Sequence, residues 1–140
     1  LKAQIDKIYV EEEGFKNFMI MFLSFGFKYG IPSDSDLVFD VRFLPNPFYI
    51  SDLKQKTGRD EEVRKFVMDS EPAQQFLKKL EDMLLFLIPH YISEGKNQLV
   101  VSIGCTGGKH RSVTLVREVS SKMIDLGYSV KTEHRDIDKD

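Results

Sequence analysis

Residues 104–112 combine three glycines with three consecutive basic side chains. Paired glycines let backbone N–H groups converge on an anion without a Cβ in the way. The basic triplet adds cationic donors, and an arginine fork suits bidentate contact with phosphate. Because an apolar run precedes this stretch and a helical pattern follows it, the N-terminus of a helix would add its positive dipole end. We therefore predict a phosphate-binding loop, with contacts from Cys105, Thr106, Gly107, Gly108, Lys109, His110, Arg111 and Ser112.

Two other readings of this stretch stay open. The glycines are also compatible with a simple tight turn whose basic side chains are solvated. The hydroxyls of Thr106 and Ser112 are compatible with helix caps. Alternatively, Cys105-x5-Arg111 has the spacing of a cysteine-dependent phosphatase loop, in which a thiolate attacks phosphorus. Such enzymes usually carry histidine where this chain has Gly104, and Asp40 is the one candidate for the acid.

The periodicity of the flanking residues predicts the elements that position this loop. Apolar or alternating runs predict strands over residues 18–25, 37–43, 99–103 and 129–135. Three- and four-residue spacing predicts helices over 60–70, 71–94 and 109–126, with Pro89 expected to kink or split the second. Prolines at 45 and 47 begin a loop that runs to residue 58. We predict an α/β fold whose sheet is mixed, partly parallel and flanked by helices.

Composition limits the function classes. The chain has 140 residues, 41% of them hydrophobic, which suits one folded domain; we assign residues 15–140 to it and residues 1–14 to a linker or short helix. A net charge of −2 does not by itself demand nucleic acid or an anionic membrane. One cysteine and no apolar run of spanning length predict a cytoplasmic protein. Three scattered histidines give no metal spacing, and there is no Walker motif.

Three motifs, at residues 24–32, 39–47 and 103–113, together resemble the C-terminal domain of the RapZ/YvcJ family of nucleotide-binding and RNase adapter proteins. The resemblance implies a longer protein, whose ATP or GTP site lies in an N-terminal P-loop domain absent from this sequence, and no cofactor in this domain. It also implies a phosphofructokinase-like subdomain that senses an amino-sugar phosphate, associates with small regulatory RNA and a ribonuclease, and forms homo-oligomers. The implied pocket comprises the loop residues above together with Asp40, Arg42 and Asn46.

This chain departs from that pattern at two places. Phe48 stands where relatives carry a polar, histidine-type pocket residue, and residues 136–140 are acidic where an RNA-binding relative would be basic. Since cationic contacts to phosphate dominate RNA affinity, the acidic end predicts weak RNA binding. The remaining basic stretch, residues 54–65, has acidic residues interleaved and is typical of a solvated face.

Overall fold

The computed structural model describes residues 14–139, in which a parallel sheet carries three helices. Its strands are β1 (Met19–Gly26), β2 (Leu37–Asp40), β3 (Gln98–Cys105) and β4 (Ser129–His134). They are ordered β2-β3-β1-β4, and every pairing is parallel. The predicted α/β class is confirmed, and the described sheet is parallel throughout instead of only in part. Parallel pairing brings the carboxyl ends of β1 and β3 to the same edge.

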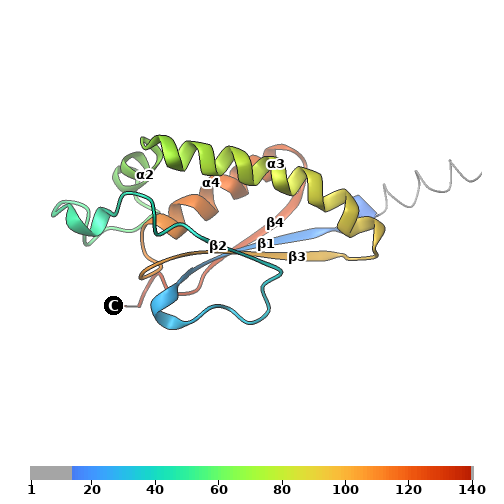
Figure 1. The fold of residues 1–140 in the computed structure, drawn as a ribbon, viewed down its shortest axis with the longest axis horizontal. Coiled ribbons are helices and arrows are strands. Elements are labelled where there is room, and N and C mark those ends of the chain that lie inside the picture. Colours follow the sequence, from blue (N-terminus) through green and yellow to red (C-terminus); the bar gives the residue numbers. More distant parts are fainter. Residues whose placement is uncertain (1–13, 140) are drawn as a thin grey trace, which may run out of the picture.

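The helices are α2 (Glu61–Met68), α3 (Glu71–Ser93) and α4 (Arg111–Asp125). All three lie on the same side of the sheet (Figure 1), where α3 and α4 pack on each other and α4 on β1, β3 and β4. Two short 3-10 turns, η1 (Phe27–Tyr29) and η2 (Pro47–Tyr49), lie in the connections after β1 and β2. The helices therefore form one layer, and the carboxyl edge of the sheet is left to loops.

The hydrophobic core lies between the helices and one face of the sheet. Ile20 and Phe22 of β1 alternate toward it, and on β3 the residues at 99, 101 and 103 do the same. Leu84 and Ile88 of α3, one turn apart, face them with no exposed surface. Burying such side chains is worth about 1.5–3 kcal/mol each, so this face fixes the sheet beneath the helices.

Two predicted boundaries differ clearly from the structure, and a predicted split does not occur. The second strand ends at Asp40, before the predicted residue 43, because the Asp40 carboxylate accepts the Arg42 N–H at 2.9 Å and turns the chain out of the ladder. The last helix begins at Arg111, since the Lys109 carbonyl accepts from Gly58 N–H at 2.9 Å. Pro89 does not split α3: it lies on the exposed side, where water can serve the carbonyl that the proline leaves unpaired.

Glycines end the two long helices as predicted. Gly95 and Gly127 have φ of 92° and 96°, a conformation that favours glycine, and each N–H closes the last turn on a helix carbonyl. The predicted linker, residues 1–14, lies outside the described residues except for Gly14. Residues 14–17 are helical. Within the described part of the chain, no helix combines the length and apolarity needed to cross a membrane.

Candidate functional site

The glycine-rich loop lies across the carboxyl ends of β1 and β3. Register pairs Gly26 with Cys105, and the N–H of Lys28 donates to the Thr106 carbonyl at 3.1 Å. A Cβ on Gly26 would lie only 2.5 Å from the carbonyl carbon of Gly107, so two backbones meet where no side chain fits. This close approach fixes the loop against the end of β1.

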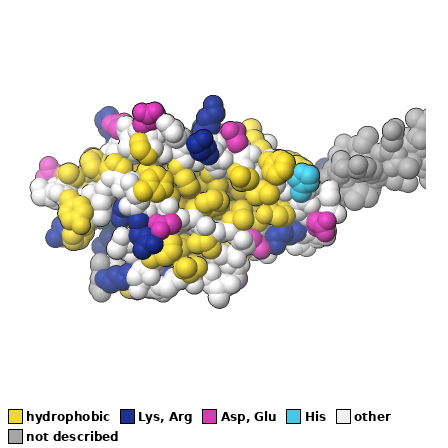
Figure 2. Space-filling view, viewed as in Figure 1, with side chains coloured by type: hydrophobic (Ala, Val, Ile, Leu, Met, Phe, Trp, Pro, Cys, Tyr) yellow, Lys and Arg dark blue, Asp and Glu magenta, His cyan; other side chains and the backbone are white. Residues whose placement is uncertain are grey.

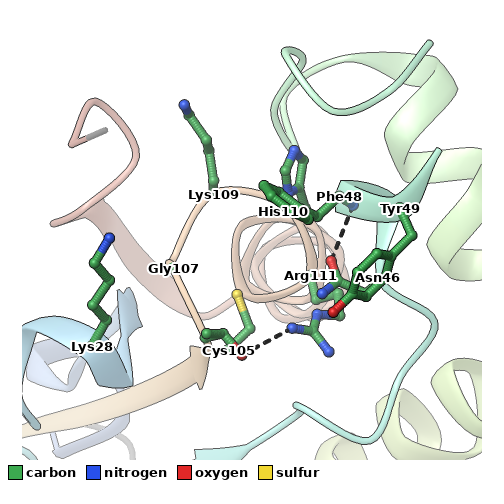
Figure 3. Close-up of a pocket in the computed structure, with 10 residues that line it drawn as sticks. Lys28, Asn46, Phe48, Tyr49, Cys105, Gly107, Lys109, His110 and Arg111 are labelled. Carbon is green, nitrogen blue, oxygen red and sulfur yellow. Dashed lines mark hydrogen bonds between the residues drawn. The ribbon is translucent and has the colours of Figure 1, made fainter. Parts of the chain in front are cut away.

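The loop borders a cavity of about 280 Å³, which we call the loop cavity. Figure 3 shows loop residues on one side of it and the segment that follows β2 on the other. The volume is near the small end of ligand pockets, which start at about 300 Å³. The cavity is lined by Lys28, Asn46, Phe48, Tyr49, Cys105, Thr106, Gly107, Lys109, His110 and Arg111.

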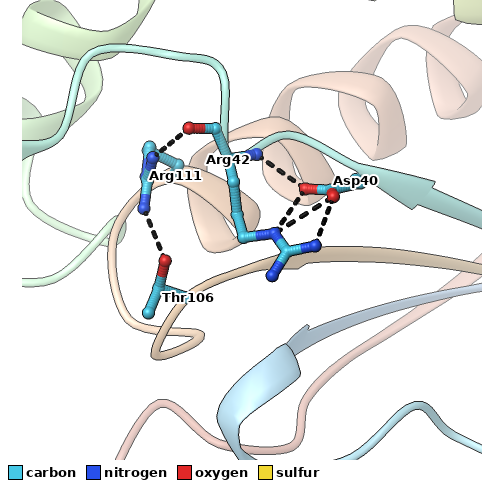
Figure 4. A network of polar contacts seen from close by, with 4 residues as sticks. All are labelled: Asp40, Arg42, Thr106 and Arg111. Carbon is cyan, nitrogen blue, oxygen red and sulfur yellow. Dashed lines mark hydrogen bonds and ion pairs between the residues drawn. The ribbon is translucent and has the colours of Figure 1, made fainter.

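Arg111 is the most buried charge in the lining, with 4% of its surface exposed. One terminal nitrogen, Nη1, donates to the Arg42 carbonyl at 2.7 Å, and Nη2 donates to Thr106 Oγ1 at 3.3 Å (Figure 4). Nη1 also donates to the Leu44 carbonyl at 3.2 Å. The buried Nε has no partner among the described residues. Carbonyls and a hydroxyl do not neutralise a guanidinium, so Arg111 keeps its positive charge beside the cavity, where it helps to lower the pKa of Asp40.

His110 fastens the segment after β2 to the glycine-rich loop. Its Nε2 lies 3.2 Å from the Lys54 carbonyl, and the side chain is almost fully buried. Burial lowers the pKa of His110, and the nearby charges of Lys109 and Arg111 lower it further, against backbone hydrogen bonds that raise it. The imidazole is thus neutral at pH 7, and it holds the segment after β2 against the loop through a hydrogen bond and not through an ion pair.

Several donors at the cavity remain unused. The backbone N–H groups of Gly107 and Lys109 donate to no acceptor among residues 14–139. The ammonium groups of Lys28 and Lys109 likewise form no ion pair within that part of the chain; the former lies 5.4 Å from the Tyr29 ring centroid. Together with Arg111, they give the cavity a surplus of positive charge.

Cys105 lies at the cavity wall but is 97% buried, since only 3% of its surface is exposed. Its Sγ is 3.2 Å from Ser112 Oγ, to which the thiol donates, and the Ser112 N–H points back at the sulfur from 3.5 Å. Ser112 therefore contacts the cysteine and not the cavity.

Four of the predicted site residues lie next to the loop cavity without lining it. Gly108 turns away with φ of 76° and packs on β1, and Ser112 lies behind the cysteine. Asp40 and Arg42 form a bidentate pair, 2.7 Å between Nη2 and Oδ2, and the guanidinium stacks 4.1 Å from the Phe27 ring centroid. The remaining predicted residues line the cavity: Asn46, Cys105, Thr106, Gly107, Lys109, His110 and Arg111.

Sequence reasoning missed three lining residues as ligand contacts, Lys28, Phe48 and Tyr49, and one residue that supports the loop, Asp136. The fully buried Asp136 carboxylate accepts the Gly26 N–H at 2.8 Å, and its Cβ lies against Gly108. Burial alone would raise the pKa of Asp136, but hydrogen bonds from Arg135, Gly26 and Lys139 lower it to about 2. Lys28 could have been predicted, because it lies two residues after β1, whose carboxyl end must meet that of β3 if the pairing is parallel.

Comparison with known proteins identifies the family of the chain. The family model described as "RapZ C-terminal domain" matches residues 18–138. The chain belongs to the RapZ C-terminal domain family. It is 61% identical over 139 residues to a nucleotide-binding protein of Lachnoclostridium phytofermentans. The aligned region covers 99% of this chain and 49% of that protein. A nucleotide-binding protein of Agathobacter rectalis is 60% identical over 141 residues, 100% of this chain and 48% of its own length.

The chain thus spans about half the length of these curated relatives. The loop cavity lies wholly within the RapZ C-terminal domain match, since its lining runs from Lys28 to Arg111. Any activity that needs the other half of the relatives is outside this domain.

Proposed function

We propose that this RapZ-family domain binds a phosphorylated small molecule, of the amino-sugar phosphate class, in the loop cavity. The observation that carries the proposal is Arg111, a buried guanidinium in the wall of the cavity. Among residues 14–139 it forms no ion pair with a carboxylate, and its Nε has no partner. Leaving such a charge unneutralised is costly, and a bound phosphate dianion would remove that cost. The free N–H groups of Gly107 and Lys109 would add backbone donors.

The domain's role is then regulatory: binding in the loop cavity reports a metabolite to the rest of a longer protein. The relatives are named nucleotide-binding proteins, and the chain covers only half of each. We place nucleotide binding in the half of such proteins that this chain lacks, and metabolite binding here. The segment after β2 is the element through which binding would act, because Arg111 and His110 both bond its carbonyls.

Calorimetric titration tests the proposal. We expect glucosamine-6-phosphate and inorganic phosphate to bind saturably, and glucosamine without phosphate not to bind. Arg111→Lys keeps the charge but loses the fork; since a hydrogen bond to a charged group is worth about 1.5–3 kcal/mol, affinity should fall by roughly 10- to 100-fold.

Arg117→Lys is the matched control, because Arg117 also lies in α4 and also donates to a backbone carbonyl, that of Gly58, at 3.1 Å, but does not line the cavity. Equal losses in the two variants would mean that destabilisation, and not the phosphate contact, causes the change. Undiminished affinity in Arg111→Lys would contradict the proposal.

A cysteine-dependent phosphatase is a second candidate, favoured by the Ser112 N–H and hydroxyl that both face the Cys105 sulfur. Asp40 does not suit the acid role, since it is paired with Arg42, which contributes most to holding the pKa of that carboxyl low, and it does not line the cavity. Hydrolysis of p-nitrophenyl phosphate that disappears in Cys105→Ser would establish this activity. Absence of turnover in the wild-type domain would exclude it.

The basic stretch 54–65 supports RNA binding less well than the loop cavity supports binding of a phosphorylated small molecule. In the basic stretch 54–65, the side chains of Lys56, Arg64 and Lys65 each pair with a carboxylate. Side chains already paired with carboxylates neutralise few phosphates, so few counterions would be released from the RNA. We expect a weak gel-shift affinity for small RNA with a shallow salt dependence, and tight binding that falls steeply with salt would contradict this.

A further inference from the structure

One cation of the loop cavity, Lys28, comes from outside the glycine-rich loop. It belongs to η1, the turn directly after β1, and it lines the cavity. Its backbone N–H donates to the Thr106 carbonyl at 3.1 Å, and Arg111 Nη2 donates to the hydroxyl of the same threonine at 3.3 Å. Lys28 and Arg111 therefore approach the loop from two sides, with Gly107 between them in Figure 3. An anion held by the Gly107 N–H would have a cation on either side.

The η1 turn is held at both ends by the segment after β4, residues 135–139. Gly26 directly precedes the turn, and its N–H donates to the fully buried Asp136 carboxylate at 2.8 Å. Gly30 directly follows the turn, and its carbonyl accepts a hydrogen bond from Arg135 Nη2 at 2.6 Å. Because both ends are bonded to one short segment, the position of the turn depends on that segment.

The middle of the turn contacts the same segment through Tyr29. The Lys139 ammonium lies 4.8 Å from the Tyr29 ring centroid, and the Lys28 ammonium lies 5.4 Å from it. Asp136 pairs through Oδ1 with Lys139 and through Oδ2 with Arg135, each at 2.8 Å. Lys28 forms no ion pair within the described part of the chain. The carboxylate thus neutralises the cations of its own segment and leaves the charge of Lys28 to an incoming anion.

Resting on the proposed function, we infer that Lys28 is a further contact of the bound phosphate and that the segment after β4 positions it. In the sequence this segment stands out only as an acidic end. In the structure its first carboxylate, Asp136, joins the turn that carries Lys28 to the glycine-rich loop, since it also lies against Gly108. A change in the segment should therefore alter the affinity for phosphate, although none of its residues lines the cavity.

Titration of the domain with inorganic phosphate tests the contact. Lys28→Met removes the ammonium group and keeps an unbranched side chain, so the affinity should fall by about 5- to 30-fold. Lys131→Met is the matched control, because Lys131 is also an exposed lysine but lies on β4 and does not line the cavity. Its affinity should stay within about twofold of wild type, since salt screens a distant exposed charge.

Asp136→Asn tests the positioning, because the two explanations of its effect differ in sign. Removing a negative charge near the cavity should by itself strengthen anion binding. Loosening η1 should weaken it, and we expect a loss of about 3- to 10-fold because the Lys28 ammonium is no longer held in place. In a Lys28→Met background, Asp136→Asn should no longer lower the affinity. If Asp136→Asn does not fold, the exposed Lys139→Gln is compared in the same two backgrounds.

Three results would overturn the inference and leave the phosphate site in place. The first is a Lys28→Met affinity within about twofold of wild type while Arg111→Lys still loses affinity. The second is unchanged or tighter binding in Asp136→Asn. The third is an equal loss in the wild-type and Lys28→Met backgrounds, because the segment would then act through the loop and not through Lys28. Absence of phosphate binding by the wild-type domain would overturn the proposed function itself and this inference with it.

Discussion

Substituting Gly26 with alanine tests whether the glycine-rich loop depends on the backbone approach at the end of β1. The added Cβ would lie 2.5 Å from the Gly107 carbonyl carbon, 2.7 Å from its oxygen and 2.8 Å from the Gly108 nitrogen. All three atoms are backbone, so no rotamer change relieves the contact. Gly26 has φ of −106° and ψ of 128°, which alanine adopts freely, and the expected cost is therefore purely steric.

Overpacking of this kind costs about 1–3 kcal/mol, which for a domain of this size lowers the melting temperature by about 3–10 °C. Thermal unfolding followed by circular dichroism measures it. Gly107→Ala is the control, because its Cβ would meet no atom within 4 Å and its φ is not in the left-handed region; we expect less than about 1 kcal/mol. A Gly26→Ala melting temperature within 1 °C of wild type would refute the account of how the loop is seated.

Three further predictions concern stability. The pKa of Asp136, about 2, lies below its ordinary value of 3.8, so the ionised carboxylate stabilises the fold above pH 4 and this stabilisation is lost as the pH falls toward 2. Asp136→Asn should lower the free energy of unfolding by about 2 kcal/mol at pH 7 and flatten its dependence on pH, as measured by urea unfolding. Burial, together with the nearby charges of Arg59 and Arg117, lowers the pKa of His134 from 6.5 to about 4. The free energy of unfolding should therefore fall by up to about 3 kcal/mol as the pH drops from 6.5 to 4. An equal dependence of this free energy on pH in wild type and His134→Gln would contradict the prediction. Ser70 Oγ accepts the Ala73 N–H at 3.2 Å and caps α3, so Ser70→Ala should lower the free energy of unfolding by about 1 kcal/mol, which denaturant titration resolves.

Local sequence patterns predicted the strands and helices. The continuous apolar run that begins at Phe18 and the three- and four-residue spacing around Leu84 carry that information locally. The end of β2 was missed although its cause is local, the Asp40 carboxylate that accepts the Arg42 N–H. The start of α4 depends on a distant contact, because no local pattern reveals that the Lys109 carbonyl accepts a hydrogen bond from Gly58.

The loop cavity shows the same limit. Its glycine-rich side was predicted, since glycines and basic residues there are contiguous in sequence. The opposite side was predicted only at Asn46: Phe48 and Tyr49 reach the cavity because Arg111 and His110 bond carbonyls of their segment, an arrangement that spacing does not encode. Asp40 and Arg42, also predicted for the pocket, pair with each other beside Arg111 and are not among the residues that line the cavity.

The most direct test of an anion site in the loop cavity is the response of individual amides to inorganic phosphate in ¹H–¹⁵N nuclear magnetic resonance spectra. We predict saturable shifts of the Gly107 and Lys109 amides and of the Arg111 Nε–H, which have no partner within residues 14–139. The amides of Gly95 and Gly127, which close helix ends, should stay unchanged. Shifts that spare the loop, or no shift at millimolar phosphate, would contradict the account.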